Sequence, residues 1–154
     1  MGRRINAAGL AMLRELEGLR REPYYDAAGF PTIGHGHLLA PIKGAPLDRW
    51  QPISEDEAGR LLSRDLTRAE HAVTSFVEEE LTDNQFSALV SFVFNIGANA
   101  FRNSTMRVLL NDGTPELAAH QFSRWIFAGG EVLEGLEKRR EREKDLFLRA
   151  DVTA

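Results

Sequence analysis

The sequence contains no cysteine, which excludes disulfide bonds and metal sites built on thiolates. It also has no excess of basic side chains, because 19 Lys and Arg are outnumbered by 23 Asp and Glu, for a formal net charge of −4. A chain without a positive field has no general electrostatic attraction to nucleic acid or to an anionic membrane. We therefore expect neither nucleic acid nor a stable membrane association among its partners.

Long hydrophobic runs are missing as well. The N-terminal stretch MGRRINAAGLAML has the arginines and the apolar patch of a secretion signal, but the patch ends at Leu13 and Arg14 and Glu15 follow at once. No small-residue cleavage site is present there, and a membrane-spanning helix needs about 18 apolar residues. We interpret this stretch as one face of a buried helix and predict no signal peptide and no membrane anchor.

Hydrophobic residues make up 43% of the 154 residues, which is enough for the core of one domain of ordinary size. We therefore predict a single domain over residues 1–154. Apolar residues recur at helical spacing behind capping residues such as Asn6, and both Ser54 with Glu57 and Thr82 with Gln85 have the pattern of a capping box. These signals predict helices over residues 6–17, 54–77, 82–97, 104–111 and 134–149, with a further helix that Thr114 caps and Pro115 begins.

The pattern changes between the first two helices. Turn-forming residues alternate there with residues that favour strands, namely Pro23, Tyr24, Tyr25, Gly29, Phe30, Pro31, Thr32, Ile33, Gly34 and Gly36. We predict a small antiparallel sheet, and hence an α+β fold that is predominantly α-helical. It would consist of a β-lobe at about 20–53, a connecting helix at 54–79 and a helical lobe at 80–150 packed with the N-terminal helix. A cleft between the lobes would be a natural binding site.

Two carboxylates and a hydroxyl lie close together within the stretch ELEGLRREPYYDAAGFPTIGHGHLL, residues 15–39. Taken singly, Glu17 is an ordinary helix-end residue, Asp26 an ordinary turn residue and Thr32 an ordinary strand residue. Glycoside hydrolysis, however, needs one carboxyl group that donates a proton to the leaving oxygen and a second that is ionised. A hydroxyl beside the second group can orient the attacking water. Together the three side chains indicate a glycosidase.

The same stretch resembles the catalytic signature of phage-type lysozymes, glycoside hydrolase family 24. That signature has Glu, eight residues, Asp or Cys, five residues and Thr, and continues as Thr-Ile-Gly-x-Gly-His; here it corresponds to Glu17, Asp26 and residues 32–37. The segments SFVFNIGANAFRNSTMRVLL and FSRWIFAGGEVLEGLEKRREREKDLFL are similar to the family's central helix and C-terminal part. The resemblance implies a two-lobed, lysozyme-like fold for the chain.

The activity that the resemblance implies is that of a muramidase, which hydrolyses the β-1,4 bond between N-acetylmuramic acid and N-acetylglucosamine in peptidoglycan, with inversion. Glu17 would be the general acid, Asp26 and Thr32 would position the water, and neither metal nor cofactor would be needed. The protein would be a monomeric phage endolysin whose partner is the peptidoglycan glycan strand. It would stay in the host bacterial cytoplasm until a holin opens the membrane, and would then act on the cell wall in the periplasm.

Substrate contacts are also implied by the resemblance. Leu38, Phe94 and Ser104 match positions that line the sugar sites of the family prototype. Asn95 keeps an amide where the prototype has Gln, and is expected to support the site. Ala119 stands where the prototype has a contacting Asn, so that contact is expected to be absent.

Further supporting roles are implied for two arginines and a histidine. Arg139 or Arg140 would pair with Glu17, and His37 would brace Glu17 or the hairpin. His35 occupies the variable position of the signature, so we expect it to be exposed or to lie at the rim of the site.

Three other functions remain open at the level of sequence. A zinc-dependent amidase would use His35 and His37 as a His-x-His pair, with His71 or His120 as a third ligand. A lytic transglycosylase cuts the same glycosidic bond without a nucleophilic water, so it would not need the second carboxylate and the hydroxyl. A wall-binding module derived from an enzyme would tend to lose one of the three candidate groups, all of which are present here.

Overall fold

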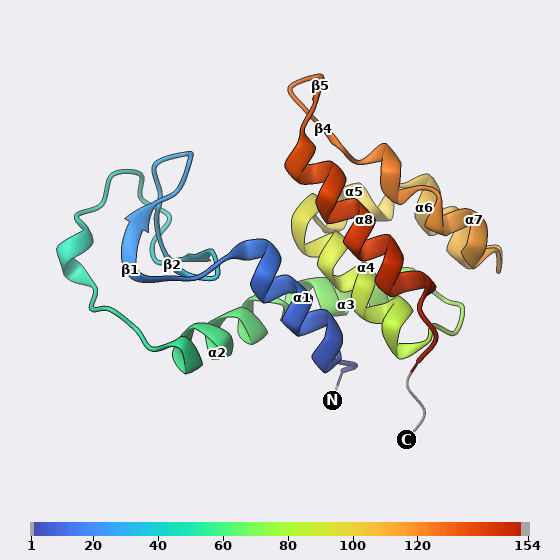
Figure 1. Ribbon diagram of the computed structural model, residues 1–154, viewed down its shortest axis with the longest axis horizontal. Coiled ribbons are helices and arrows are strands. Elements are labelled where there is room, and N and C mark those ends of the chain that lie inside the picture. The colour runs from blue at the N-terminus through green and yellow to red at the C-terminus, as the bar shows by residue number, and fades with distance from the viewer. Residues whose placement is uncertain (1, 152–154) are drawn as a thin grey trace. The chain divides into compact units, whose positions relative to one another are not determined.

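The computed structural model describes residues 2–151, and Figure 1 shows their course. Met1 and residues 152–154, the two ends of the predicted single domain, lie outside the described residues. The chain divides into two compact units. The sheet unit contains Ala11–Leu66, and the helical unit contains Met1–Leu10 and Thr67–Ala154.

The sheet unit is built around a three-stranded antiparallel sheet of order β1-β2-β3. Its elements are β1 (Arg20–Tyr25), β2 (Pro31–Gly34), β3 (His37–Leu38), α2 (Glu55–Asp65) and the larger part of α1 (Ala7–Glu17). A short 3-10 helix, Leu47–Arg49, interrupts the irregular segment before α2. The predicted small antiparallel sheet is therefore confirmed.

Side chains at the starts of α1 and α2 satisfy backbone donors that a first helical turn leaves without partners. The side-chain oxygen of Asn6 accepts a hydrogen bond from the Gly9 N–H at 2.9 Å. The hydroxyl oxygen of Ser54 accepts from the Glu57 N–H at 3.1 Å, and its proton is donated to the Glu57 carboxylate at 3.2 Å. Both predicted helix starts are confirmed.

Strand β2 is the buried centre of the sheet unit, and all its residues are buried. It packs on helix α2, and the two backbones approach closely at Gly34. A β-carbon on Gly34 would lie 3.3 Å from the β-carbon of Ala58, and its φ of +71° is one that other residues rarely adopt. This glycine therefore permits the contact between sheet and helix.

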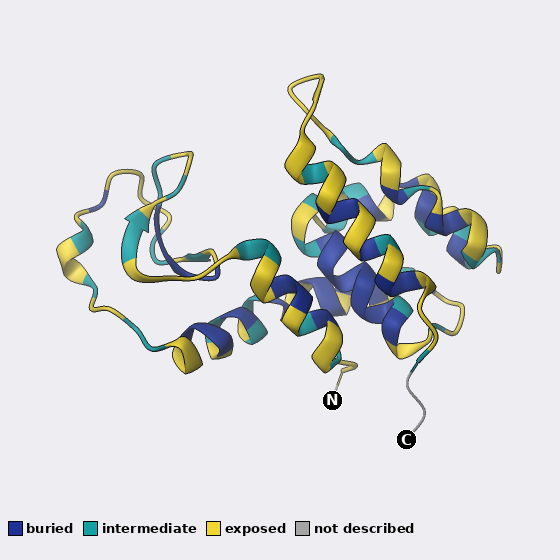
Figure 2. Cartoon of the chain, in the orientation of Figure 1, coloured by how far each residue is buried: buried dark blue, intermediate teal, exposed yellow. Residues whose placement is uncertain are grey.

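The helical unit contains α3 (Thr67–Phe76), α4 (Asp83–Ile96), α5 (Ala98–Arg102), α6 (Thr105–Asn111), α7 (Pro115–Ala119), α8 (Glu134–Leu148), and a hairpin of β4 (Phe127–Ala128) and β5 (Glu131–Val132). Figure 2 shows that α4 is largely buried, and all of its residues 86–93 are buried. The helix packs against α3 and α8. The capping box of Thr82 and Gln85 is confirmed at the start of α4.

Within residues 2–151, no helix has both the length and the apolar character needed to cross a membrane.

One predicted helix is two helices in the structure. The apolar repeat predicts a single helix over residues 54–77, but α2 ends at Asp65 and α3 begins at Thr67. Leu66 between them is fully buried and keeps φ and ψ of −74° and −16°. Because this interruption leaves the apolar repeat intact, the sequence pattern does not reveal it. The two compact units divide at the same point.

Three smaller features also differ from the sequence-based expectation. The Thr114 hydroxyl donates to the Leu109 carbonyl at 2.9 Å and does not cap α7, although Pro115 does begin that helix. Helix α5 and the β4–β5 hairpin were not predicted. The hairpin turns through Gly129 and Gly130, which have φ of +59° and +82° and so suit a tight turn.

Candidate active site

Glu17 is the last residue of α1 and is half-buried. The helix ends there because Gly18 adopts a φ of +73°, which glycine tolerates best, while its N–H donates to the Arg14 carbonyl at 3.0 Å. The carboxyl group lies beside the turn between β2 and β3, since a β-carbon built on Gly36 would be 3.8 Å from Glu17 Oε2. The candidate acid thus has a helix end on one side and a glycine turn on the other.

Asp26 holds the turn between β1 and β2. Its Oδ1 accepts hydrogen bonds from the N–H groups of Ala28 and Phe30, both at 2.9 Å. The Asp26 N–H donates in turn to the Phe30 carbonyl, also at 2.9 Å. Among the described residues none hydrogen-bonds to Oδ2. The turn-forming role and the predicted catalytic role are therefore compatible in one side chain, because they use different oxygens.

Thr32 lies within β2, only 3% exposed, opposite Tyr24 on β1 and Leu38 on β3. Its hydroxyl donates to the Phe30 carbonyl at 2.9 Å. Because the hydroxyl proton is used in this bond, the oxygen meets any further partner as an acceptor. Phe30 thus connects the two candidates that would handle water, since its N–H binds Asp26 and its carbonyl binds Thr32.

His37 on β3 pairs with Asp65 at the end of α2. Its Nδ1 lies 2.8 Å from Asp65 Oδ2 and 3.1 Å from Oδ1. The pair joins the hairpin to the helix, and the predicted role of His37 in bracing Glu17 or the hairpin stays a prediction. Asp65 was not predicted, because a partner 28 residues away along the chain leaves no local pattern.

His35 is buried, with 5% of its surface exposed, so the expectation of an exposed side chain is wrong. Its ring folds inward from the turn between β2 and β3, and Nδ1 hydrogen-bonds to the Gly18 carbonyl. A carbonyl oxygen can only accept, so Nδ1 carries the proton. His35 therefore connects this turn with the residue that directly follows Glu17.

The two imidazoles of the His-x-His pair face different partners, the Gly18 carbonyl and the Asp65 carboxylate. Within residues 2–151, no three His, Asp or Glu side chains form a group that could hold a metal ion. His71 and His120, the proposed third ligands, belong to α3 and to the end of α7. The described part of the chain therefore offers no ligand set for the zinc amidase hypothesis.

Arg139 and Arg140 lie on α8, where both are buried beside the fully buried Glu143. One Glu143 oxygen accepts from Ser91 Oγ at 2.6 Å and from Arg139 Nε at 3.2 Å. Arg140 donates to the other Glu143 oxygen and to the side-chain oxygen of Asn95. Burial lowers the pKa of the Arg140 guanidinium from its ordinary value, and Glu143 opposes that shift. This ionic network joins α8 to α4, and Glu143 was not predicted.

The three candidate sugar-binding residues have different surroundings. Leu38 on β3 is 46% exposed, which suits a contact with a sugar, and Phe94 on α4 is half-buried. Ser104 is buried, and its hydroxyl caps α6 by accepting from the Arg107 N–H at 3.1 Å while donating to the Phe101 carbonyl at 2.7 Å. Their contacts with sugars stay predictions, as does the pairing of an arginine with the general acid.

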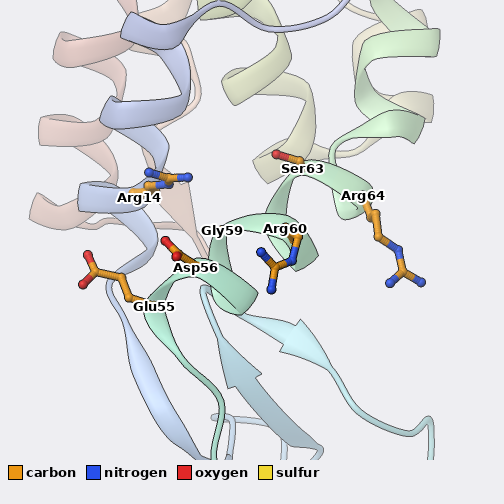
Figure 3. A pocket seen from close by; sticks show the side chains of 7 residues that line it. All are labelled: Arg14, Glu55, Asp56, Gly59, Arg60, Ser63 and Arg64. Carbon is orange, nitrogen blue, oxygen red and sulfur yellow. The ribbon is translucent and has the colours of Figure 1, made fainter.

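A pocket of about 510 Å³ opens on α1 and α2 of the sheet unit (Figure 3). It is lined by Arg14, Glu55, Asp56, Gly59, Arg60, Ser63 and Arg64. The Arg14 guanidinium lies over Gly59, because a β-carbon there would come 2.6 Å from Nη2. The lining carries charges of both signs and includes none of the three candidate catalytic side chains.

A helix-end carboxyl group beside a hairpin that carries a second carboxylate and a hydroxyl is the set of groups expected of a glycoside hydrolase. The comparison with known families gives the same class. The chain belongs to the phage lysozyme family, whose model matches residues 14–143.

Individual relatives agree with this assignment. The chain is 38% identical over 146 residues to the endolysin of Bacillus phage B103, covering 94% of this chain but only 54% of that relative. It is 38% identical over 144 residues to the endolysin of Salmonella phage P22, covering 94% of this chain and 97% of that one. Its structure is similar to the muramidase domain of SpmX from Asticaccaulis excentricus, with a TM-score of 0.82, 37% identity, and coverage of 95% and 98%. The α+β fold is thereby confirmed.

Proposed function

We propose that this chain is a muramidase that hydrolyses the β-1,4 bond between N-acetylmuramic acid and N-acetylglucosamine in peptidoglycan. The observation that carries the proposal is the backbone frame of the sheet unit, in which the end of α1 holds Glu17 and Phe30 holds both Asp26 and Thr32. These are the groups that glycoside hydrolysis requires. Membership of the phage lysozyme family and relatives named as endolysins and a muramidase support it.

Glu17 acts as the general acid. In its protonated form it donates to the glycosidic oxygen as the bond between that oxygen and the anomeric carbon breaks. Proton transfer requires the donor to lie within hydrogen-bonding distance of the leaving oxygen. The half-buried site between the end of α1 and the turn at Gly36 restricts where the carboxyl group can point.

Asp26 acts as the general base, and Thr32 orients the water. Backbone N–H groups hold Asp26 Oδ1, which leaves Oδ2 to take a proton from the attacking water. Thr32 already donates its hydroxyl proton to Phe30, so its oxygen accepts the second hydrogen of that water. The water oxygen bonds to the anomeric carbon on the face opposite to the leaving group, which inverts the configuration.

The substrate of this reaction is the peptidoglycan glycan strand. The exposed Leu38 supports a contact with its sugars, and Phe94 and Ser104 would extend that contact. We assign the protein the role of a phage endolysin, in line with the names of its relatives. We propose separately that it works as a monomer. As an endolysin it waits in the host cytoplasm and reaches the cell wall once a holin has opened the membrane.

Replacing Glu17 with Gln tests the assignment of the acid. Glutamine keeps the size and the hydrogen-bonding capacity of the side chain but cannot act as an acid. Clearing of a cell-wall suspension should fall by about a hundredfold to ten-thousandfold, while the melting temperature stays close to that of the unchanged protein. Glu15→Gln, an exposed position on the same helix, is the matched control and should retain activity.

Full activity of Glu17→Gln would contradict this role of Glu17. Mass spectrometry of the products distinguishes the reaction classes, because hydrolysis adds one water at each cut bond whereas a lytic transglycosylase leaves anhydro-muramyl ends. NMR spectra of freshly released products distinguish inversion from retention by the anomer that forms first.

A further inference from the structure

The buried ring of His35 forms a hydrogen bond through one of its two nitrogens, and the other nitrogen has no partner among the described residues. Nδ1–H donates to the Gly18 carbonyl. Nε2 is also buried and has no hydrogen-bond partner among the described residues. Because Nδ1 carries the donated proton, Nε2 of the neutral ring presents a lone pair, and no group of the described residues donates to it.

This unsatisfied acceptor costs stability. A buried polar atom without a partner destabilises the folded state, whereas an apolar side chain of similar size would fill the space without that cost. Filling space therefore does not by itself account for a histidine at position 35, because an apolar residue could not supply the hydrogen bond to the Gly18 carbonyl. A locally unfavourable residue beside a candidate active site points to a role in function.

The turn that carries His35 meets the end of α1 at two points. The first is the hydrogen bond from His35 to Gly18, which directly follows Glu17 and has a φ of +73°. The second is Gly36, where a β-carbon would lie 3.8 Å from Glu17 Oε2. The turn formed by His35 and Gly36 thus lies next to both the backbone after the candidate acid and the acid itself.

We propose that His35 is a positioning residue for Glu17. Its Nδ1–H holds the Gly18 carbonyl, keeps the end of α1 against the turn between β2 and β3, and so sets the direction of the Glu17 carboxyl group. Glycine after a helix is free to adopt many conformations, so this tether limits a backbone that would otherwise be loose. The inference rests on the proposed role of Glu17 as the general acid.

Three substitutions separate positioning from stability. His35→Asn places an amide N–H near the position of Nδ1 and keeps the bond to Gly18, but leaves part of the ring volume empty. His35→Leu fills the volume and removes the donor, and His35→Gln places its amide nearer to the position of Nε2. We expect kcat to fall about tenfold in His35→Leu and His35→Gln with KM little changed, and to stay within about twofold in His35→Asn.

The melting temperatures should not follow the activities. His35→Leu fills the volume but removes the hydrogen bond to the Gly18 carbonyl, whereas His35→Asn keeps that bond but leaves a cavity, so both should melt somewhat below the unchanged protein although only His35→Leu is slow. If His35 were merely structural, activity would instead follow stability across these variants. His120→Leu, at an exposed histidine at the end of α7, is the control and should change neither quantity.

An unchanged kcat in His35→Leu would overturn the inference, and so would a His35→Asn protein as slow as His35→Leu. Glu17→Gln is measured in the same assay. If Glu17→Gln is also fully active, the proposed general acid is wrong. If Glu17→Gln is inactive while His35→Leu keeps its full rate, the positioning role alone is wrong.

Discussion

Asp26 shows how a single side chain can serve both the fold and the proposed reaction. Its Oδ1 closes the turn between β1 and β2 through two backbone hydrogen bonds of 2.9 Å each. Short polar side chains that bind the backbone just ahead of them are ordinary features of turns. In the proposed mechanism the same bonds fix the carboxylate plane and so direct Oδ2 at the water.

Asp26→Asn separates these two tasks. The amide oxygen can still accept from the N–H groups of Ala28 and Phe30, so the turn and the melting temperature should change little. The amide nitrogen cannot accept a proton, so we expect lysis of a cell-wall suspension to fall by about a hundredfold or more. Retention of full activity in a correctly folded Asp26→Asn protein would show that Asp26 is not the base.

At this scale the sequence predicts residues whose spacing along the chain carries the signal, as for Glu17, Asp26 and Thr32. Asp65 and Glu143 carry no such signal, because their partners come from other elements of the fold. The exposure of a turn residue such as His35 is not encoded locally either. It depends on the direction in which the side chain points and on the residues that lie beneath it. His35 was misjudged for that reason.

Helices α4 and α8 are held together by charges in a buried setting. Glu143 on α8 is fully buried and binds Arg139, Arg140 and Ser91. The Arg140 guanidinium also lies over the Phe92 ring, with 5.0 Å between its central carbon and the ring centroid. A buried ion pair gains little over apolar packing, but removal of one partner leaves an uncompensated charge and is costly.

Replacing Glu143 with Gln should therefore destabilise the protein strongly. Two buried guanidinium groups would lose a carboxylate that both of them bind, and we expect the free energy of unfolding to fall by about 3 kcal/mol. Urea denaturation followed by circular dichroism measures this loss. Glu141→Gln, at an exposed position of the same helix, is the matched control and should stay within about 0.5 kcal/mol. Equal stability of the two variants would contradict the structural importance of the network.

Helix starts were predicted well because a cap involves residues only a few positions apart, as with Thr82 and Gln85. The division of the predicted long helix at Leu66 was not predicted, since a buried leucine fits an uninterrupted apolar repeat as well as an interrupted one. The apolar repeat therefore does not locate the boundary between the two compact units.

For the molecule as a whole, the proposed chemistry needs no metal ion. General acid and base catalysis by two carboxyl groups completes the hydrolysis without one. We therefore expect dialysis against EDTA to leave the rate of cell-wall clearing within about twofold of the untreated rate, because the groups that move protons are all side chains. A loss of activity that added zinc restores would favour the amidase hypothesis instead.

The sequence by itself determined the α+β class, most helix starts, the small antiparallel sheet and the spacing of Glu17, Asp26 and Thr32. These features depend on residues close together in the chain, so local physical rules suffice to predict them. The tertiary structure alone decided that His35 is buried against Gly18, that His37 pairs with Asp65, and that the two arginines of α8 meet Glu143 and α4. Such contacts join distant segments, and they form because packing has already placed those segments next to one another.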